Sequence, residues 1–238
     1  MAPCVNWFFG RGLSIGCGLD WSVPSEWSAL PRSDTIARIK SKVLNEMLAS
    51  HVCAADIAQF LSILASHTAP PWQHQFFTTN WDYLLQREIF ALGLINQPAW
   101  CAETHVYHLN GTVENLPNNL NRSEFILETD PPHARTASIE GSKAFNKFIW
   151  NRIFVVVGMS FECEADKYLL RSISGVQDDL PIGESSWYIL NPNGLDLANT
   201  AQRISVALPR AKITMLHKTF RAWLDEKFPE LHACGALN

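Results

Sequence analysis

Short runs of apolar residues alternate along the chain with longer segments of helical spacing. The clearest run is 152–157, in which Ile153, Phe154 and three valines follow one another without interruption. An unbroken run of this kind is typical of a central parallel strand that is buried on both faces. Other short apolar runs predict strands at 5–9, 75–78, 106–109, 187–190 and 213–216, with a further extended segment at 125–127.

The segments between these strands predict helices. Ser33 and Asp34 are typical of a helix N-cap, and the spacing predicts helices at 35–48, 55–66, 82–92, 143–150 and 219–228. Strands that alternate with helices, without hairpin turns, favour a parallel sheet covered on both faces. We therefore expect an α/β, Rossmann-like doubly wound fold. The expected organisation is one domain over 1–238, with 33–66 as a candidate small helical cap.

Composition narrows the class of protein and its partners. Hydrophobic residues make up 47% of the chain and charged residues 18%, which excludes a disordered chain. A net charge of −4 favours neither nucleic acid nor an anionic membrane as a partner. Apolar runs stay well short of the roughly 18 residues of a membrane span. The first four residues lack the basic region of a signal peptide, so we expect a cytoplasmic protein.

The cysteines exclude a common kind of zinc site. There are six, and no two form a C-x-x-C pair, which a zinc ribbon requires. They are also too sparse for a disulfide framework in a chain of this size. We expect reduced thiols and no bound zinc or other metal.

Small or polar residues follow five of the predicted strands. They are Gly10, Thr79-Asn80, Asn110-Gly111, Gly158 and Asn191. In open sheets of this type, ligands bind beyond the carboxyl ends of the strands. The pattern thus predicts a binding site, although such residues also serve as ordinary turns.

These strand ends resemble, in chain order, the motifs of the sirtuin superfamily. The resemblance covers about 5–220. The chain is also similar to the zinc-free bacterial branch of this superfamily, whose members consume NAD, because that branch has similar residues at 125–128 and at Asp166. The matching segments are Gly10-Arg11-Gly12-Leu13-Ser14, Phe77-Thr78-Thr79-Asn80-Trp81-Asp82, His108-Leu109-Asn110-Gly111, Val157-Gly158-Met159-Ser160-Phe161 and Leu190-Asn191.

The resemblance implies that NAD is the substrate or ligand. It places Asn80 at the nicotinamide-side ribose and Asp82 at the nicotinamide amide. Asn191 is implied at the adenosine ribose. The other implied cofactor-binding residues form the loops around the phosphates and riboses, and they are Gly10, Arg11, Gly12, Ser14, Thr79, Gly111, Gly158 and Ser160. A glycine-rich strand-to-helix turn does let backbone N–H groups approach a pyrophosphate.

Purely structural roles for the same residues stay open. The glycines of the two loops could form tight turns only. Asn80 or Asp82 could cap the helix that follows. Asn191, which precedes Pro192, is equally typical of an Asx turn.

Two departures from the family matter for the chemistry. The missing zinc ribbon favours small-molecule NAD chemistry over acyl-lysine peptides. The family's catalytic His falls on Asn110, and an Asn side chain cannot act as a base near pH 7. If the segment is extended, His108 shares a face with Asn110 and could act through one water, about 7 Å along the strand. His108 could equally be a core histidine, and His105 lies on the opposite face.

Two functions of different classes follow. The first is an NAD⁺ glycohydrolase that releases nicotinamide and ADP-ribose, with Asn80, Asp82, His108 and Asn110 as the catalytic set. The resemblance alone implies a role in antiphage defence. In that role, a separate protein or the formation of a homo-oligomer would activate the enzyme. The second is a catalytically impaired NAD or ADP-ribose sensor that acts with a protein partner.

Two further enzyme classes fit the sequence less well. Ser160, Asp196 and His217 have the chain order of a hydrolase triad, but Glu162 replaces the second glycine of the G-x-S-x-G motif. An ordinary dehydrogenase would have a complete G-x-G-x-x-G motif, and Ile15 stands in the place of its third glycine.

Seven of the nine tryptophans fall into two groups. Trp7, Trp187 and Trp223 are expected to pack in the core, as is Trp150 at the end of its helix. Trp21, Trp27 and Trp81 lie beside the predicted nucleotide site. Their fluorescence is expected to respond to NAD.

Overall fold

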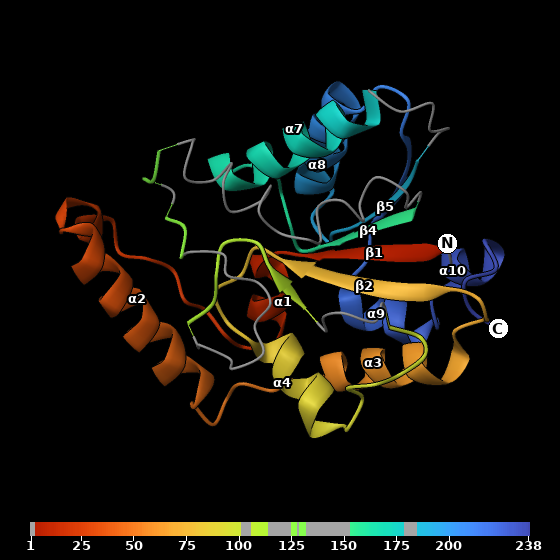
Figure 1. Cartoon of the computed structure of the whole chain (residues 1–238), viewed down its shortest axis with the longest axis horizontal. Helices are drawn as coiled ribbons and strands as arrows, with labels where there is room; N and C mark the ends of the chain where they lie inside the picture. Colours follow the sequence, from red (N-terminus) through yellow and green to blue (C-terminus); the bar gives the residue numbers. More distant parts are fainter. Residues whose placement is uncertain (1–2, 101–105, 114–124, 128, 132–152, 179–184) are drawn as a thin grey trace.

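A six-stranded parallel sheet forms the centre of the molecule (Figure 1). The computed structural model describes residues 3–100, 106–113, 125–127, 129–131, 153–178 and 185–238. The strand order is β3-β2-β1-β4-β5-β6. The strands are β1 (Cys4–Phe9), β2 (Gln73–Thr78), β3 (Tyr107–His108), β4 (Ile153–Val157), β5 (Ser186–Leu190) and β6 (Lys212–Leu216). This order is that of a doubly wound nucleotide-binding sheet, so the predicted α/β Rossmann-like fold is confirmed.

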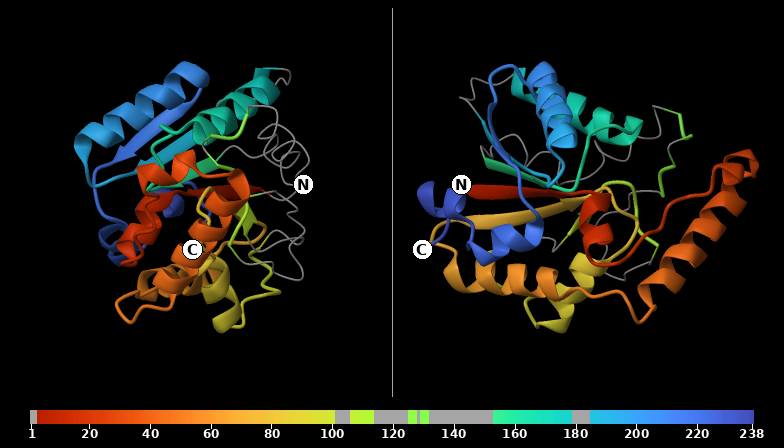
Figure 2. Two further views of the ribbon diagram at one scale, coloured as in Figure 1. Left: turned by 90° about the vertical axis from the view of Figure 1, so that its left-hand side faces the viewer. Right: turned by 180° about the vertical axis from the view of Figure 1, so that it is seen from behind.

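Helices cover both faces of this sheet. Helices α7 (Glu164–Asp178) and α8 (Gly194–Ala207) lie on one face, and α3 (Ala55–His67), α4 (Leu84–Ala91) and α9 (Phe220–Asp225) lie on the other (Figures 1 and 2). The other helical elements of the described residues are α1 (Arg11–Gly16), the 3₁₀ helix η1 (Ser25–Ala29), α2 (Arg32–Met47) and α10 (Pro229–Ala233).

Each face of the sheet has its own apolar core. On the α7 and α8 side, Phe8, Phe154 and Trp187 come from three adjacent strands and stack in parallel, with ring centroids 4.3–6.2 Å apart. On the other side, Trp7 packs against Phe60 of α3 with a centroid distance of 4.7 Å. Aromatic burial on this scale supplies a large share of the hydrophobic free energy of folding.

The tryptophans of these cores agree with the sequence-based prediction. Trp7, Trp187 and Trp223 are completely buried. Trp150 lies outside the described residues, as do the predicted helix 143–150, Cys101, His105 and Glu128.

All six predicted strands are present in the described residues, whereas the segment 125–127 has no strand structure. The boundaries of three predicted helices were wrong, and the helix predicted at 82–92 begins only at Leu84 and ends at Ala91. Helix α2 begins at Arg32 with Pro31 as its N-cap residue, so Ser33 and Asp34 lie in its first turn. The closing helix ends at Asp225, because Lys227 and Phe228 have left-handed backbone conformations that break it.

The segment 33–66 divides between two parts of the molecule. Helix α3 lies in the layer on the sheet, where Ile57, Phe60, Leu61 and Leu64 are buried in the main core. Helix α2 extends from the edge of that layer (Figure 1). Of the predicted cap over 33–66, the part that forms α3 packs on the sheet. The single domain over 1–238 stays a prediction.

Candidate functional site

The carboxyl ends of β1 and β4 meet at the centre of the sheet, where the strand order reverses. The loops that follow these strands contact each other through glycine. The amide of Gly12 donates to the carbonyl of Gly158 at 2.9 Å, and the amide of Gly10 donates to Val157 at 3.0 Å. A Cβ atom on Gly12 would lie 2.6 Å from the Cα of Gly158, which itself has φ +63°. Only glycine permits this contact.

The glycine contact separates two hollows on the surface. The Asn80 cleft has a volume of about 490 Å³ and is lined by residues that follow β1, β2, β3 and β4. The Asn191 cleft has a volume of about 780 Å³ and is lined by residues of α1 and by residues that follow β4, β5 and β6. Both volumes fall in the usual range for small-molecule sites. The residues that line both clefts are Gly158, Met159, Ser160 and Glu162.

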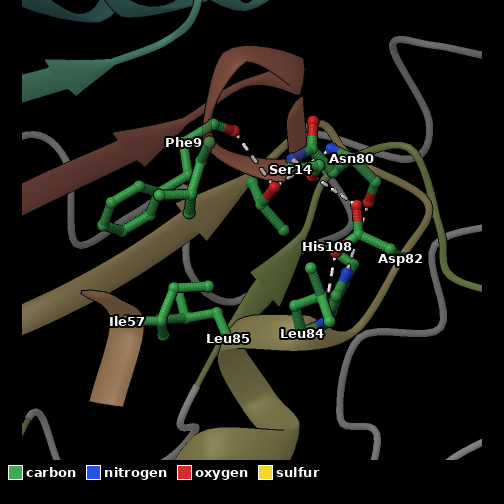
Figure 3. A pocket seen from close by; sticks show the side chains of 10 residues that line it. Phe9, Ser14, Ile57, Asn80, Asp82, Leu84, Leu85 and His108 are labelled. Carbon is green, nitrogen blue, oxygen red and sulfur yellow. Dashed lines mark hydrogen bonds between the residues drawn. The ribbon is translucent and has the colours of Figure 1, made fainter. Parts of the chain in front are cut away.

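A buried polar network lies between the Asn80 cleft and a small inner cavity, whose lining Figure 3 shows. The Asn80 Nδ2 donates to Ser14 Oγ at 2.8 Å and to the carbonyl of Gly10 at 3.0 Å. The Ser14 hydroxyl donates in turn to Asp82 Oδ2 at 2.6 Å. The loop after β2 and the helix after β1 are thus joined by side chains that are at most 5% exposed.

Asp82 is the acidic centre of this network. Burial raises the pKa of its carboxyl group, and hydrogen bonds from Ser14, the Leu84 amide and Trp21 oppose that rise. The amide of Leu84 donates to Oδ1 at 3.2 Å, which forms a local turn just before α4. The N-cap residue of α4 is Tyr83, so neither Asn80 nor Asp82 caps this helix.

Behind the network lies a small inner cavity that contains His108. Its volume is about 10 Å³, close to the size needed for one water molecule. His108 is 1% exposed, and its Nε2 lies 3.3 Å from Gln86 Oε1. Burial lowers the pKa of His108 to about 4, so its imidazole is neutral at pH 7. Ser14, Asn80 and Asp82 line the same cavity.

Asn110 faces the Asn80 cleft and not this cavity. Strand β3 ends at His108, and the amide of Gly111, with φ +77°, donates back to the His108 carbonyl at 3.1 Å. This turn contradicts the extended segment that would have put His108 and Asn110 on one face. The Asn110 Nδ2 donates to the carbonyl of Thr79 at 3.1 Å, which joins the loops after β2 and β3.

Trp21 connects the open cleft to the buried carboxylate. Its indole Nε1 donates to Asp82 Oδ2 at 3.1 Å, and its ring lies 5.1 Å from that of Trp81. Arg11 lies over the same ring at 5.5 Å and pairs with Asp20. Spacing along the chain gives no signal for the contact between Trp21 and Asp82, because 61 residues separate them.

The Asn191 cleft has a different kind of polar wall. Asn191 Oδ1 accepts from the amide of Asn193 at 2.8 Å, which is the Asx turn anticipated as an alternative. Asn193 caps α8 by accepting from the amides of Leu195 and Asp196. Ser160 Oγ accepts from the amide of Glu162 at 3.3 Å. These side chains hold local turns at the mouth of the cleft.

The predicted site residues thus lie at the carboxyl edge of the sheet, and all of them except Gly10 and Gly111 line one of the two clefts or the inner cavity. Their roles stay predictions. Sequence reasoning missed Trp21 as a partner of Asp82, and it missed Glu162 and Cys163 as lining residues of the Asn80 cleft. Asp166, noted only through the resemblance, is a buried carboxylate that lines this cleft.

The alternative hydrolase triad has no support from geometry. His217 Nε2 lies 2.8 Å from the carbonyl of Pro192, on the surface. Among the described hydrogen bonds, none joins Ser160, Asp196 and His217.

Within the described part of the chain, no group of three or more His, Cys, Asp or Glu side chains is arranged to hold a metal ion. The five cysteines described there are free thiols. No helix among these residues has the length and apolar character needed to cross a membrane.

Comparison with known proteins gives similarities to solved structures alone. No protein-family profile matches the chain, and no curated protein matches it. The chain is similar to a solved structure described as "Structural Basis for the Mechanism and Regulation of Sir2 Enzymes", with 12% identity and a TM-score of 0.48. The similarity covers 98% of this chain and 94% of that one. The fold assignment above rests on the strand order and the packing of the sheet.

Proposed function

We propose that this protein binds NAD and hydrolyses its nicotinamide–ribose bond. The observation that carries the proposal is the pair of clefts on either side of the contact between Gly12 and Gly158, at the reversal of the strand order. A dinucleotide has two halves joined by a pyrophosphate, and doubly wound sheets bind such ligands across this point.

The distribution of polar residues supports one orientation of the ligand. The motif resemblance assigns Asn80 and Asp82 to the nicotinamide half, and both belong to the β1-β2-β3 side. It assigns Asn191 to the adenosine half, and Asn191 lines the other cleft. Ser160 lines both clefts, as expected of a residue near the phosphates. The Gly12 amide already donates to Gly158, so phosphate contacts would come from other groups.

The reaction breaks the N-glycosidic bond and adds water at the ribose carbon. Nicotinamide leaves as a neutral molecule, and the water loses one proton to solvent as ADP-ribose forms. The transition state resembles an oxocarbenium ion, so nearby carboxylates stabilise it. In this proposal Asn80 orients the ribose and Asp82 accepts from the carboxamide. Asp166 and Glu162 supply negative charge in the Asn80 cleft.

Asp82 does not line the Asn80 cleft, so a carboxamide in that cleft would reach Asp82 past the indole of Trp21, which lines the cleft. The inner cavity is too small for a nicotinamide ring, and Trp21 already donates to Asp82. We therefore expect the indole of Trp21 to move on binding, which would change its fluorescence. Trp81 lies in contact with Trp21 and would report the same event.

A second candidate function is an NAD or ADP-ribose sensor without catalysis. Asn110 favours it, because this cleft-lining amide cannot remove a proton. His108 is neutral but sits in the inner cavity, where only a water-mediated contact could reach the substrate. Loss of general-base assistance costs about 10²–10⁴ in rate, so a slow hydrolase is also compatible with these residues.

The deciding experiment measures nicotinamide release and ligand binding on the same preparation. The hydrolase proposal expects release from NAD, lost in Asn80→Ala and kept in Asn45→Ala, a matched change on the exposed surface of α2. Tight binding of NAD or ADP-ribose without release would instead support the sensor. Neither binding nor release would contradict both functions.

Two finer proposals rest on the motif resemblance alone. They are NAD depletion in antiphage defence and activation by a partner protein or by self-assembly. Intracellular NAD after phage infection, compared between wild type and Asn80→Ala, tests the first. An isolated monomer with full activity would contradict the second.

A further inference from the structure

Between α1 and α3 the chain leaves the layers that cover the sheet and then returns to them. It leaves at Cys17, the C-cap residue of α1, passes through η1 and α2, and returns at Cys53, just before α3 begins. We call residues 18–52 the α2 excursion, and α2 itself extends away from the sheet (Figure 1). Trp21 of this excursion lines the Asn80 cleft. A cysteine thus stands at each end of a long segment that reaches the candidate site.

The two ends of the α2 excursion meet through their backbones. The amide of Cys53 donates to the carbonyl of Cys17 at 2.9 Å. Beside this bond, Gly18 has φ +82°, and a Cβ atom on it would lie 2.9 Å from the carbonyl oxygen of His51. Standard bond lengths on either side of the hydrogen bond limit the Cα–Cα distance between the two cysteines to about 6 Å. Disulfide bonds span Cα–Cα distances of about 4.4–6.8 Å, so the backbone separation fits one.

The two thiols are free, and they differ in exposure. Cys53 is exposed, whereas Cys17 is 4% exposed and lines the Asn191 cleft. Burial is the main reason that the pKa of Cys17 is raised to about 12, and further contributions come from Asp82, Asp56, Cys53 and Glu88. Cys17 is therefore a protonated thiol at pH 7. A soluble reagent reaches Cys53 first, and Cys17 reacts second.

We propose that Cys17 and Cys53 form a disulfide bond when a low-molecular-weight disulfide acts as the oxidant, and that this bond fastens the base of the α2 excursion. The thiol of Cys53 loses its proton, and its sulfur attacks one sulfur of the small disulfide, which releases one half as a thiolate. The sulfur of Cys17 then loses its proton and attacks the Cys53 sulfur, which releases the other half. The two protein sulfurs are oxidised, and the small disulfide is reduced to two thiols that take up the two protons.

This modification does not depend on whether the chain binds or cleaves NAD. Nicotinamide release is measured in a separate experiment, so the failure of one proposal does not decide the other.

The test incubates the folded, full chain with glutathione disulfide, blocks the remaining thiols and identifies the cysteine pairs by mass spectrometry after digestion. We expect the bond between Cys17 and Cys53 to be at least about tenfold more abundant than the mixed disulfide of glutathione at Cys53. The reason is that a tethered thiol has an effective concentration of about millimolar, well above that of the glutathione released by micromolar protein. A mixed disulfide that persists at Cys53, or a dominant bond to another cysteine, would overturn the proposal.

Variants separate the two steps of the reaction. Cys17→Ala is expected to trap the mixed disulfide at Cys53, because the second thiol is missing. Cys53→Ser changes an exposed side chain, and it is expected to leave Cys17 unmodified. Cys234→Ser, a matched change at a half-buried cysteine, should leave the bond between Cys17 and Cys53 unchanged. Equal modification of Cys17 in wild type and in Cys53→Ser would contradict the order of the steps.

Two further measurements connect the bond to the fold. In concentrated urea the preference for this pair should fall at least about tenfold, since the folded backbone no longer holds the two cysteines together. A preference that persists in urea would show that the fold does not pair them, and it would overturn the proposal. The thermal midpoint of the oxidised protein should lie roughly 5 °C above that of the protein reduced with dithiothreitol, with no such difference in Cys53→Ser. An unchanged midpoint would show that the bond does not fasten the excursion.

Discussion

The two sides of the strand-order reversal hold their polar residues in different ways. On the Asn80 side, Ser14, Asn80 and Asp82 are buried and bonded to one another across 66 and 68 residues of chain. On the Asn191 side, Asn191 and Asn193 bond to amides two or three residues away. The first side depends on the whole fold, and the second is built from local turns. Substitutions should therefore cost stability on the Asn80 side and much less on the Asn191 side.

The largest expected effect is at the glycine contact between the two sides. Gly12→Ala would bring a Cβ to 2.6 Å from Gly158 backbone, whereas Gly16→Ala on the same helix meets nothing within 4 Å. We expect Gly12→Ala to lower the free energy of unfolding by about 3 kcal/mol. Gly16→Ala should leave it unchanged or raise it by up to about 1 kcal/mol. Urea denaturation measures both, and equal values would show that the contact is not tight.

A somewhat smaller effect is expected from removing the acidic centre of the network. Asp82→Ala leaves the Ser14 hydroxyl and the Trp21 and Leu84 N–H groups without their acceptor. We expect a loss of about 2 to 3 kcal/mol in the free energy of unfolding. Asn191→Ala, the matched change on the other side, should cost less than about 1 kcal/mol because its turn is exposed to solvent. A larger cost for Asn191→Ala would contradict the comparison.

The pH dependence of stability is expected to reveal His108. Its folded pKa of about 4 lies below the ordinary value of 6.5, so below pH 6.5 the unfolded chain takes up a proton that the folded chain does not. The contribution of the neutral, buried His108 to the free energy of unfolding is therefore complete above pH 6.5, and it is lost as the pH falls toward 4. At pH 5 the loss amounts to roughly 2 kcal/mol.

Two other buried groups titrate in the same experiment. His74, with a folded pKa of about 3, acts in the same direction as His108. Asp82, whose pKa is raised, acts in the opposite direction, since its protonation favours the folded state. The difference between wild type and His108→Gln, measured by denaturation at pH 7.5 and pH 5, isolates the His108 contribution. An identical pH dependence in both proteins would show that His108 is not buried as described.

The smallest effect is expected at the cap of α8. Asn193→Ala removes the acceptor for two amides and should cost about 1 kcal/mol. Asn193→Ser should restore most of that stability, because Ser is also a good N-cap residue. Thermal unfolding of the two variants measures the difference. Ligand binding on the Asn80 side should be the same in both.

Much of the sheet could be predicted because its central strands, β1 and β4, are short apolar runs that are buried on both faces. The run that became β4 is the best example, with Phe154, Val155 and Val156 fully buried. Helix α8 was missed although a signal exists, since Asn193 is a good N-cap residue and Leu197, Thr200 and Ile204 have helical spacing. Sequence reasoning treated Asn191-Pro192 as the end of a strand and did not continue into the next element.

The candidate site could be predicted only where neighbouring residues define it. Asn80 and Asp82 lie two residues apart and were found together, whereas the contact between Trp21 and Asp82 depends on how distant loops pack. The separation of His108 from Asn110 follows from a turn that Asn110-Gly111 favours, because glycine accepts a positive φ. The assumption of an extended strand overrode that local signal.

The glycine contact also has a consequence for how affinity would combine across the two clefts. Backbone atoms, which cannot change rotamer, set the separation of the two hollows. Two mononucleotides would bind them as independent ligands. A dinucleotide joins its two halves by a linker. If this linker matches the separation of the clefts, the second half binds with an effective concentration of about millimolar, the value typical of a short flexible linker. The ratio between the affinity for the whole ligand and the product of the affinities for its halves therefore measures how closely the backbone spacing matches a pyrophosphate.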